Sequence, residues 1–571
     1  MKKTLFPAVM TVLMTPATVF AQDMTLSVQG LEGALKKNAE AYLAAIPSNE
    51  YSVSLRFQGR LQKSLNQSLN ALGYYHAKFH FQIEDSGQQL VIQITPGPPT
   101  RIKHLDIQIS GEAQHDPDFK RLLEGSGLRV GEVLNQGQYD VLKSAIRNLA
   151  LQKGYFDGKF SQAQLDVSPA NNQAFIHLHY ASGQRSQFGA TTITGSQIQL
   201  SRVKSLQPYQ KGDPYLASDI TKLYRNLAAT DWFSSVVVTP DLSQSQADNE
   251  IPIKVVLTPE TKNKLETGLG YSTDVGVRGT LKWNKPWVND KGDSFTSSFS
   301  LSKPEQEVTF GYRMPLANVW RDYYLLQYGM KKVDNLDTDS LESNLSFGRH
   351  WTLDNGWHRT LRIRYLVENY QQGLQDDVGQ FVMPGIAFSR TRSRGGAMPT
   401  WADSQSLSLE YGDSALASET RVLRVQGGSS WIRSLGHNQR GLFRLDAGAN
   451  ITEQFNKLSP SLRFFAGGDN SIRGYSYDSI SPTDDSGALT GGKYLLTTSL
   501  EYQHRIVGNW WGALFYDYGD AFTDSPDFKR GTGFGLRWAS PVGPVRLDFA
   551  WGLDAPSGTA FRLHFSLGPE L

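Results

Sequence analysis

The chain has 571 residues, with 57 lysines and arginines against 55 aspartates and glutamates, and a formal net charge of +2 at pH 7. This balance gives no indication of a nucleic-acid partner, because proteins of that class carry a basic surface. The sequence contains no cysteine, which excludes disulfides, thiol catalysis, thiolate metal sites and a cysteine-borne lipid anchor. The length is sufficient for several domains.

The N-terminus has the pattern of an export signal. Lys2 and Lys3 precede a mostly apolar run over residues 5–20, which ends in small residues suited to cleavage. We therefore predict a signal peptide over residues 1–21, whose removal lowers the basic count from 57 to 55, equal to the acidic count. No later segment has the roughly 18 continuous apolar residues of a transmembrane helix. The mean hydropathy of −0.39 also suits a transmembrane barrel, in which only alternate residues face lipid.

A unit of about 80 residues repeats in the first half. Its anchors are Gly73, Gly154 and Asp231, and each is followed directly by two aromatic residues. Glycine tolerates a positive φ and ends a helix, so the aromatic pair should start a strand. The apolar residues eight and four positions before each anchor fall on one helix face: Leu65, Leu69, Ile146, Ala150, Leu223 and Leu227.

Each repeat also opens and closes with a strand pattern. The opening strands are predicted at 26–30, 105–111 and 190–195, and the closing strands at 90–94, 174–179 and 251–256. The order strand, helices, strand, strand describes a small α+β domain with helices on one sheet face. It resembles the POTRA domain, and we predict three copies at 22–98, 99–186 and 187–261. The alternative is three unrelated α+β domains. An open sheet edge in such a domain is able to pair with an extended client.

The second half, residues 262–571, loses the helical pattern and contains sixteen alternating strand candidates. An even strand number with aromatic-rich ends is typical of an outer-membrane β-barrel, although a soluble β-sandwich also buries apolar faces. Along 493–506 the odd positions are mostly polar and the even ones mostly apolar, so the polar set should face the lumen. The last strand, at 559–568, should turn Phe561, Leu563, Phe565 and Leu567 outward in the same way.

A long segment at about 453–490 separates the eleventh and twelfth strand candidates. It contains Phe464-Phe-Ala-Gly-Gly-Asp-Asn-Ser-Ile-Arg-Gly-Tyr475, and loops of this length are usually functional. This motif resembles the signature loop of the BamA/TamA outer-membrane assembly superfamily, whose core is (V/I)RG(F/Y). The segments 538–544 and 567–571 resemble late-strand and terminal motifs of the same superfamily. Three POTRA-like repeats and the terminal motif fit its TamA group best.

The resemblance implies that this loop folds into the barrel lumen. A guanidinium there requires anionic partners, because an unpaired buried charge is costly, and its fork favours carboxylates. We predict that Arg473 binds Asp517, with Glu501 as a second partner. Whether the loop is a static anchor or sets barrel shape and gating stays open. The complete loop-anchoring set is Arg473, Gly474, Tyr475, Glu501, Asp517, Gly467 and Gly468, with the glycines allowing tight turns and close backbone approach.

The seam between the first and last strands is the second candidate site. Pro569 lacks a backbone donor, so strand pairing should weaken there, and the resemblance implies a lateral gate at which clients are threaded or templated. The predicted gate residues are Leu265, Leu269, Tyr271, Phe561, Leu563, Phe565, Gly568 and Pro569.

The resemblance also implies a function. It indicates an assembly factor of the bacterial outer membrane, with POTRA domains in the periplasm, which promotes insertion or secretion of autotransporter-like clients. The implied partners are these clients, the lipid bilayer and a TamB-like protein anchored in the inner membrane. No cofactor and no catalysed reaction are expected. Two alternatives remain: a two-partner-secretion-type transporter that passes one polypeptide through its lumen, and a barrel hydrolase, for which no nucleophile motif stands out.

Two weaker signals point to ligands. Residues 487–493 match most of a phosphate-binding loop, but Tyr494 occupies the position that needs serine or threonine, and a strand follows instead of a helix. His177 and His179 share a strand face, but no third metal ligand is apparent in the sequence. The sequence therefore predicts neither a nucleotide site nor a metal site.

Overall fold

The structure is a computed structural model that describes residues 24–571 except 85–87, 245–248, 397, 541–542, 557, 559 and 568–571. The predicted signal peptide, Gly568 and Pro569 lie outside the described residues. In the described part of the chain, none of the helices combines the length and the apolar character that crossing a bilayer requires.

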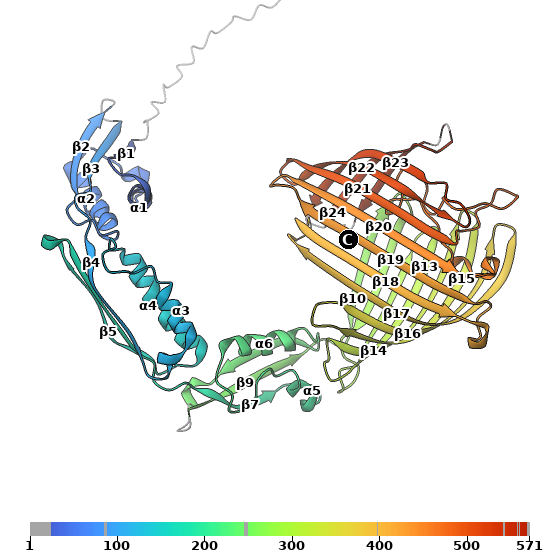
Figure 1. The fold of residues 1–571 in the computed structure, drawn as a ribbon, viewed down its shortest axis with the longest axis horizontal. Coiled ribbons are helices and arrows are strands. Elements are labelled where there is room, and N and C mark those ends of the chain that lie inside the picture. Colours follow the sequence, from blue (N-terminus) through green and yellow to red (C-terminus); the bar gives the residue numbers. More distant parts are fainter. Residues whose placement is uncertain are drawn as a thin grey trace, which may run out of the picture. The chain divides into compact units, whose positions relative to one another are not determined.

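Three small sheets come first in the chain, each with its closing strand in the centre (Figure 1). The opening strand pairs with this central strand in parallel in the first two sheets. The first sheet contains β1 Thr25–Gln29, β3 Gln89–Thr95 and β2 Lys78–Glu84, with α1 Gly33–Ala44 and α2 Leu55–Asn70. The second contains β4 Arg101–Ser110, β6 Gln173–Ala181 and β5 Lys159–Ser168, with α3 Pro117–Glu124 and α4 Gln136–Lys153. The third contains β7 Gln187–Thr194, β9 Glu250–Pro259 and β8 Phe233–Pro240, with α5 Leu200–Lys204 and α6 Ala217–Ala228.

The repeat anchors explain why each long helix ends where it does. Gly73, Gly154 and Asp231 all have positive φ, at 88°, 85° and 57°. Aspartate is among the few residues with a side chain that tolerate this conformation, so Asp231 takes the place of glycine in the third copy. The six apolar residues predicted to share the helix face before these anchors are all buried, as expected for the side that packs on the sheet.

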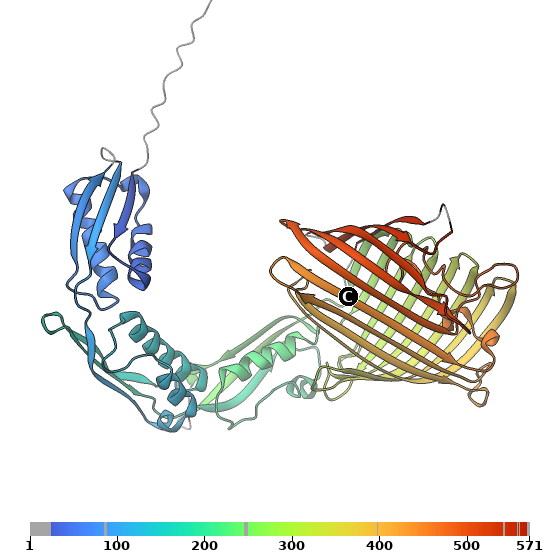
Figure 2. The ribbon, with the colours of Figure 1, turned by 45° about the horizontal axis from the view of Figure 1, so that its top comes forward.

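Strands β10 to β25 close into a single antiparallel barrel, which confirms the predicted sixteen strands (Figures 1 and 2). Each strand pairs with its neighbour in sequence, and β10 meets β25. The strands are β10 Lys264–Ser272, β11 Gly276–Lys285, β12 Ser294–Leu301, β13 Glu305–Pro315, β14 Asp322–Asn335, β15 Thr338–Thr352, β16 His358–Gln372, β17 Gln375–Arg394, β18 Trp401–Gly412, β19 Val422–Ser434, β20 Gln439–Ile451, β21 Tyr494–Val507, β22 Trp510–Phe522, β23 Lys529–Ser540, β24 Gly543–Gly552 and β25 Phe561–Leu567.

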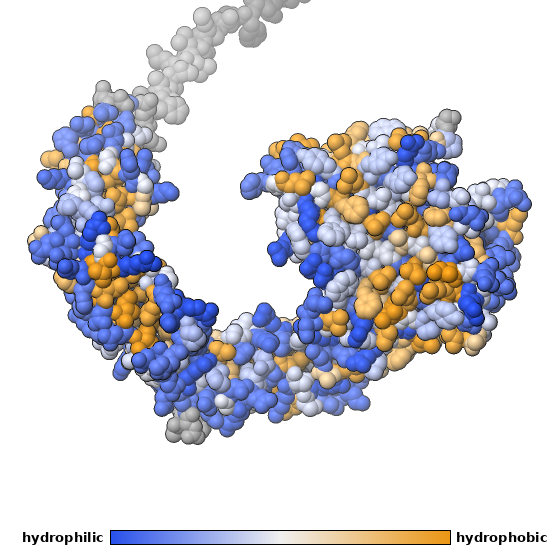
Figure 3. All heavy atoms as spheres, in the orientation of Figure 1, coloured by the Kyte–Doolittle hydropathy of each residue, from blue (hydrophilic) through white to orange (hydrophobic). Residues whose placement is uncertain are grey.

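The barrel wall has an apolar outside and a polar inside. Along β21, Ser499 and Glu501 are buried, whereas the intervening Leu500 is 62% exposed, as the alternation of a strand requires. The same alternation exposes Phe561 and Leu563 on β25. Figure 3 shows apolar side chains gathered on the barrel surface over β16–β18. A contiguous apolar exterior of this kind belongs in a lipid environment.

Candidate functional site

The segment between β20 and β21 is held together by pairing within the segment itself. Isolated bridges join Phe464 to Gly492 and Ala466 to Ile480, and short 3-10 turns occur at 455–457 and 460–462. Its apolar side chains form a buried cluster with Ala521 of β22: Phe464, Ala466, Ile472, Tyr475 and Ile480. The segment therefore carries its own small core, which gives Arg473 a fixed position.

Arg473 forms the two ion pairs that the sequence analysis predicted. Its Nε and Nη2 atoms donate to the two carboxylate oxygens of Asp517 at 2.8 Å each, and its Nη1 atom donates to Glu501 at 2.7 Å. The backbone N–H of Arg473 also donates to Asp517, at 3.0 Å. The Asp517 side chain is fully buried and that of Arg473 is 6% exposed. A buried, bidentate ion pair fixes both the position and the orientation of the loop.

The charge cluster extends beyond these three residues. Arg537 of β23 donates to Glu501 at 2.8 Å and to Asp548 of β24 at 2.7 Å, and Arg473 lies 3.4 Å from Asp548. Two guanidinium groups thus face three carboxylates. The guanidinium carbon of Arg473 also lies 3.5 Å from the centroid of the Phe515 ring, a favourable cation–π contact.

The sequence analysis missed Arg537 and Asp548. The signal that could have found them is the alternation along 531–540 and 543–553, which turns both side chains toward the lumen. Alternation alone does not give the strand register, however, and it is the register that places Asp548 opposite Gly535, two residues before Arg537.

Gly474 meets the barrel wall where no side chain fits. Its φ is +96°, and a Cβ atom there would lie 2.4 Å from the backbone nitrogen of Gly552. Its N–H donates to Nε2 of His564 on β25, at 3.0 Å. The next residue, Tyr475, accepts a hydrogen bond from the Asp554 N–H through its hydroxyl, at 3.1 Å. The Tyr475 hydroxyl also lies 3.4 Å from the Arg530 carbonyl oxygen of β23, so the Arg473–Tyr475 tripeptide contacts all five strands from β21 to β25 and the turn after β24.

Gly467 and Gly468 allow two further close approaches. Both have positive φ, at 107° and 100°. A Cβ at Gly467 would lie 2.3 Å from the carbonyl oxygen of Ser476, and one at Gly468 would lie 2.6 Å from the carboxylate of Asp274. These positions have the close backbone approach that the sequence indicated.

Beside Gly468, Asp469 bonds to both sides of the barrel seam. Its backbone N–H donates to Asp274, in the turn after β10, at 2.7 Å, and its carboxylate accepts from the Thr273 hydroxyl at 3.2 Å. The same carboxylate is hydrogen-bonded to Nδ1 of His564. Since Nε2 of His564 accepts from Gly474, both ring nitrogens are engaged. We call Asp469, His564, Asp274 and Thr273 the seam latch; sequence reasoning missed it because its members are far apart in the chain.

The predicted gate residues that the structure describes lie on β10 and β25, the two strands that meet at the seam. Within the described residues, which end at Leu567, Ser272 and Ser566 form one registered pair between β10 and β25, whereas β10 pairs with β11 from Lys264 to Ser272. The rings of Tyr271 and Phe565 lie 5.8 Å apart. The side chains exposed along this seam are Leu265 at 66%, Leu269 at 85%, Tyr271 at 49%, Phe561 at 51% and Leu563 at 46%.

The fold and this site define a class of protein. A closed barrel with an apolar exterior, a loop fixed by buried charges and small α+β units ahead of it is an outer-membrane β-barrel protein with periplasmic POTRA domains. The chain belongs to the Omp85 superfamily: the Omp85 superfamily domain matches residues 261–570. The family described as POTRA domain TamA domain 1 matches residues 25–96.

Individual relatives agree with this family. "Outer membrane protein assembly factor BamA" of Nitratidesulfovibrio vulgaris is 24% identical over 396 residues, covering 62% of this chain and 48% of that protein. "Outer envelope protein 80, chloroplastic" of Arabidopsis thaliana is 33% identical over 142 residues, covering 23% and 17%. The chain thus matches about half of the BamA relative's length and less of the chloroplast protein. Crystalline BamA from Haemophilus ducreyi lacking POTRA domains 1–3 has a TM-score of 0.71 at 15% identity, covering 82% of this chain and 99% of that one, which supports the fold.

Proposed function

We propose that this chain is an assembly factor that promotes insertion or secretion of autotransporter-like β-barrel clients through a lateral gate between β10 and β25. The observation that carries this proposal is the seam, where the described residues of β10 and β25 share one registered pair, whereas β10 is paired with β11 from Lys264 to Ser272. An unpaired strand edge presents free N–H and C=O groups that a client strand is able to take up.

The three sheets ahead of the barrel supply the binding arm in this proposal. Their outer strands offer further edges to extended clients. We assign to the same arm a TamB-like partner anchored in the inner membrane, in agreement with the match of residues 25–96 to a TamA-type POTRA domain. The similarity to the BamA relative, an outer membrane protein assembly factor, supports the assembly role.

Locking the seam tests the gate. Ser272 and Ser566 are directly opposite, and opposed residues of antiparallel strands have Cα atoms about 4.5–5.5 Å apart, within the range a disulfide spans. The native chain has no cysteine, so Ser272→Cys/Ser566→Cys gives one defined crosslink. We expect the oxidised double variant to lose client assembly and the reduced protein to regain it.

A second crosslink controls for the chemistry of the lock. Ser298 of β12 is opposite Thr309 of β13 within a continuous ladder, so Ser298→Cys/Thr309→Cys closes a bond where no opening is proposed. Full client assembly by the oxidised Ser272→Cys/Ser566→Cys protein, with the disulfide verified, would show that the gate proposal is wrong.

A further inference from the structure

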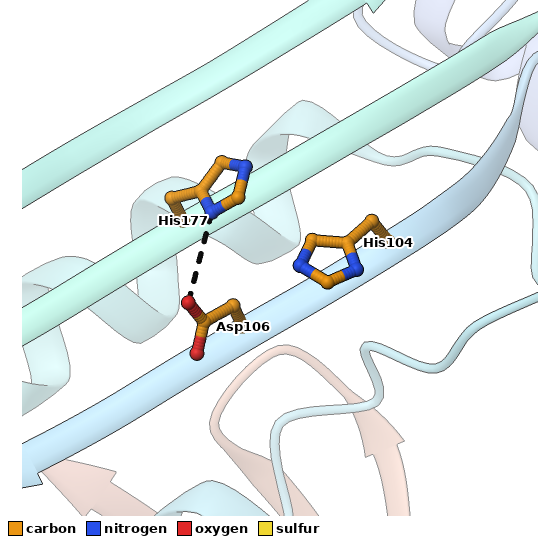
Figure 4. Close-up of side chains that lie close together, drawn as sticks. All are labelled: His104, Asp106 and His177. Carbon is orange, nitrogen blue, oxygen red and sulfur yellow. Dashed lines mark ion pairs between the residues drawn. The ribbon is translucent and has the colours of Figure 1, made fainter.

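The second small sheet carries a cluster of histidines and an aspartate on the face away from its helices. Residues Ala174, Ile176 and Leu178 of β6 are buried in the core under α3 and α4, so the alternate residues His177 and His179 project from the opposite face. The parallel neighbour β4 places Asp106 opposite His177. Figure 4 shows His104, Asp106 and His177 converging between the two strands.

A β-bulge brings His104 into this cluster. Ile102 is buried whereas His104, two residues on, is exposed, although residues two apart normally share a face. The pairing of β4 with β6 shifts register between these two residues, and the extra residue reverses the alternation. Bulges re-aim side chains in this way and are over-represented beside functional sites. The sequence pattern did not reveal this third ligand, because the bulge depends on the pairing with β6.

The three side chains are close enough to share one ion. Each offers a ligand atom, and these atoms all lie within 4.8 Å of one another. Nδ1 of His177 is 3.7 Å from Oδ2 of Asp106, and the rings of His104 and His177 are 5.1 Å apart between centroids. Zn²⁺ holds nitrogen and oxygen ligands at about 2.0–2.2 Å, so tetrahedral ligand atoms lie about 3.4 Å apart. Small rotations of these partly exposed side chains reach that geometry.

The carboxylate is already oriented by its neighbours. The Gln108 amide donates to Oδ1 of Asp106 at 2.9 Å, and Nε2 of His179 lies 2.7 Å from Oδ2. Carboxylates that bind metals are typically fixed by such outer hydrogen bonds.

We propose that this face binds a borderline divalent transition-metal ion of the Zn²⁺ type, with His104, Asp106 and His177 as ligands and His179 as a positioning residue. Two imidazole nitrogens and one carboxylate oxygen form a donor set that suits such ions. The bound ion would join β4, an edge strand of the sheet, to the central strand β6. Three protein ligands leave a coordination position for water.

Among the residues that the structure describes, the seam latch contains a second comparable group, Asp274, Asp469 and His564. Both ring nitrogens of His564 are already hydrogen-bonded, to Gly474 and Asp469. That group therefore holds itself together by hydrogen bonds, and we assign no ion to it.

Calorimetric titration of the full-length, tag-free protein with ZnCl₂ tests the proposal. We expect one site in the wild type and its loss in His104→Ala/His177→Ala. His179→Ala should bind about tenfold to a hundredfold more weakly, as for loss of a positioning neighbour. His80→Ala, which removes an exposed histidine from β2 of the first sheet, is the matched control and should bind as the wild type does.

Two further measurements separate ligand loss from misfolding. Asp106→Asn is isosteric and should weaken binding while the circular dichroism spectrum stays unchanged. X-ray absorption of the zinc-loaded wild type should show imidazole ligands, which disappear in the double variant. Unchanged affinity in His104→Ala/His177→Ala, or no binding by a wild type that is folded, would overturn the proposal.

Discussion

At the scale of single residues, we expect substitution of Arg473 to destabilise the barrel strongly. Its removal leaves Asp517, Glu501 and Asp548 with Arg537 as the remaining guanidinium of the cluster, and breaking a buried pair from one side typically costs about 3–5 kcal/mol. We predict that Arg473→Ala lowers the unfolding temperature of the barrel, measured by heat-dependent mobility on gels. Arg473→Lys should be only partly better, because an ammonium does not reproduce the fork on Asp517.

Arg505 provides the matched control for this substitution. It lies on the same strand as Glu501, is exposed and donates to the Gly508 carbonyl in the adjacent turn. Arg505→Ala should therefore leave the unfolding temperature nearly unchanged. If Arg473→Ala and Arg505→Ala behaved alike, the buried cluster would not be what fixes the loop.

Gly474 and Gly487 separate two reasons why a glycine resists substitution. Both have positive φ, at 96° and 84°, but a Cβ at Gly474 meets the backbone of Gly552 at 2.4 Å whereas one at Gly487 has nothing within 4 Å. We predict that Gly487→Ala costs about 1 kcal/mol from backbone strain alone, and that Gly474→Ala is clearly worse. Barrel unfolding temperatures measure both, and equal losses would contradict the role assigned to the close approach.

At the scale of elements, Lys153 joins two helices of the second unit. Its ammonium at the end of α4 lies 2.6 Å from Asp116, which caps α3, and it also pairs with Asp118. Burial alone would lower the pKa of Lys153, but these two carboxylates raise it overall. A raised lysine pKa stabilises the fold below its unfolded value of about 10.4 and loses that effect as pH rises through the folded value.

We therefore predict that Lys153→Met loosens α3 at neutral pH. The expected loss is about 1 kcal/mol, the upper end for partly exposed pairs, and it should appear as faster hydrogen exchange over residues 117–124 in the full chain. Lys143→Met is the control, because Lys143 lies on α4 and faces the rings of Tyr139 and Phe160. Equal exchange over α3 in both variants would contradict the role assigned to the Lys153 ion pairs.

At the same scale, the barrel strands could be predicted from the sequence, whereas some of the contacts between elements could not. Period-two alternation was sufficient to predict the barrel strands. The Arg473 contacts could be predicted because the loop motif identified the arginine and the strand alternation placed carboxylates on the lumen face. The His104 ligand and the Asp469–His564 contact could not, since the first depends on a bulge and the second joins residues 95 positions apart. Pairing register and loop closure are set by tertiary contacts, which a single sequence does not display.

At the scale of the whole barrel, one loop connects the charge cluster with the seam latch, because it contributes Arg473 to the first and Asp469 to the second. Arg473 bonds to β21, β22 and β24, and Asp469, four residues earlier, bonds to the seam through His564 and Asp274. Displacement of Arg473 should therefore be transmitted to the seam. If the proposed gate opens, both Arg473→Ala and Asp469→Ala should raise the population of the open seam.

The engineered pair Ser272→Cys/Ser566→Cys measures that population, since its disulfide forms only when β10 and β25 are paired. We predict a lower disulfide yield after mild oxidation in either variant than in the parent. In the same cysteine background, the combined Arg473→Ala/Asp469→Ala substitution should give about the same yield as either single substitution, because residues of one connected network do not have additive effects. The Ser298→Cys/Thr309→Cys pair should crosslink equally in all of them. Undiminished yield at the seam in both single variants would mean that the loop is an anchor without influence on the gate.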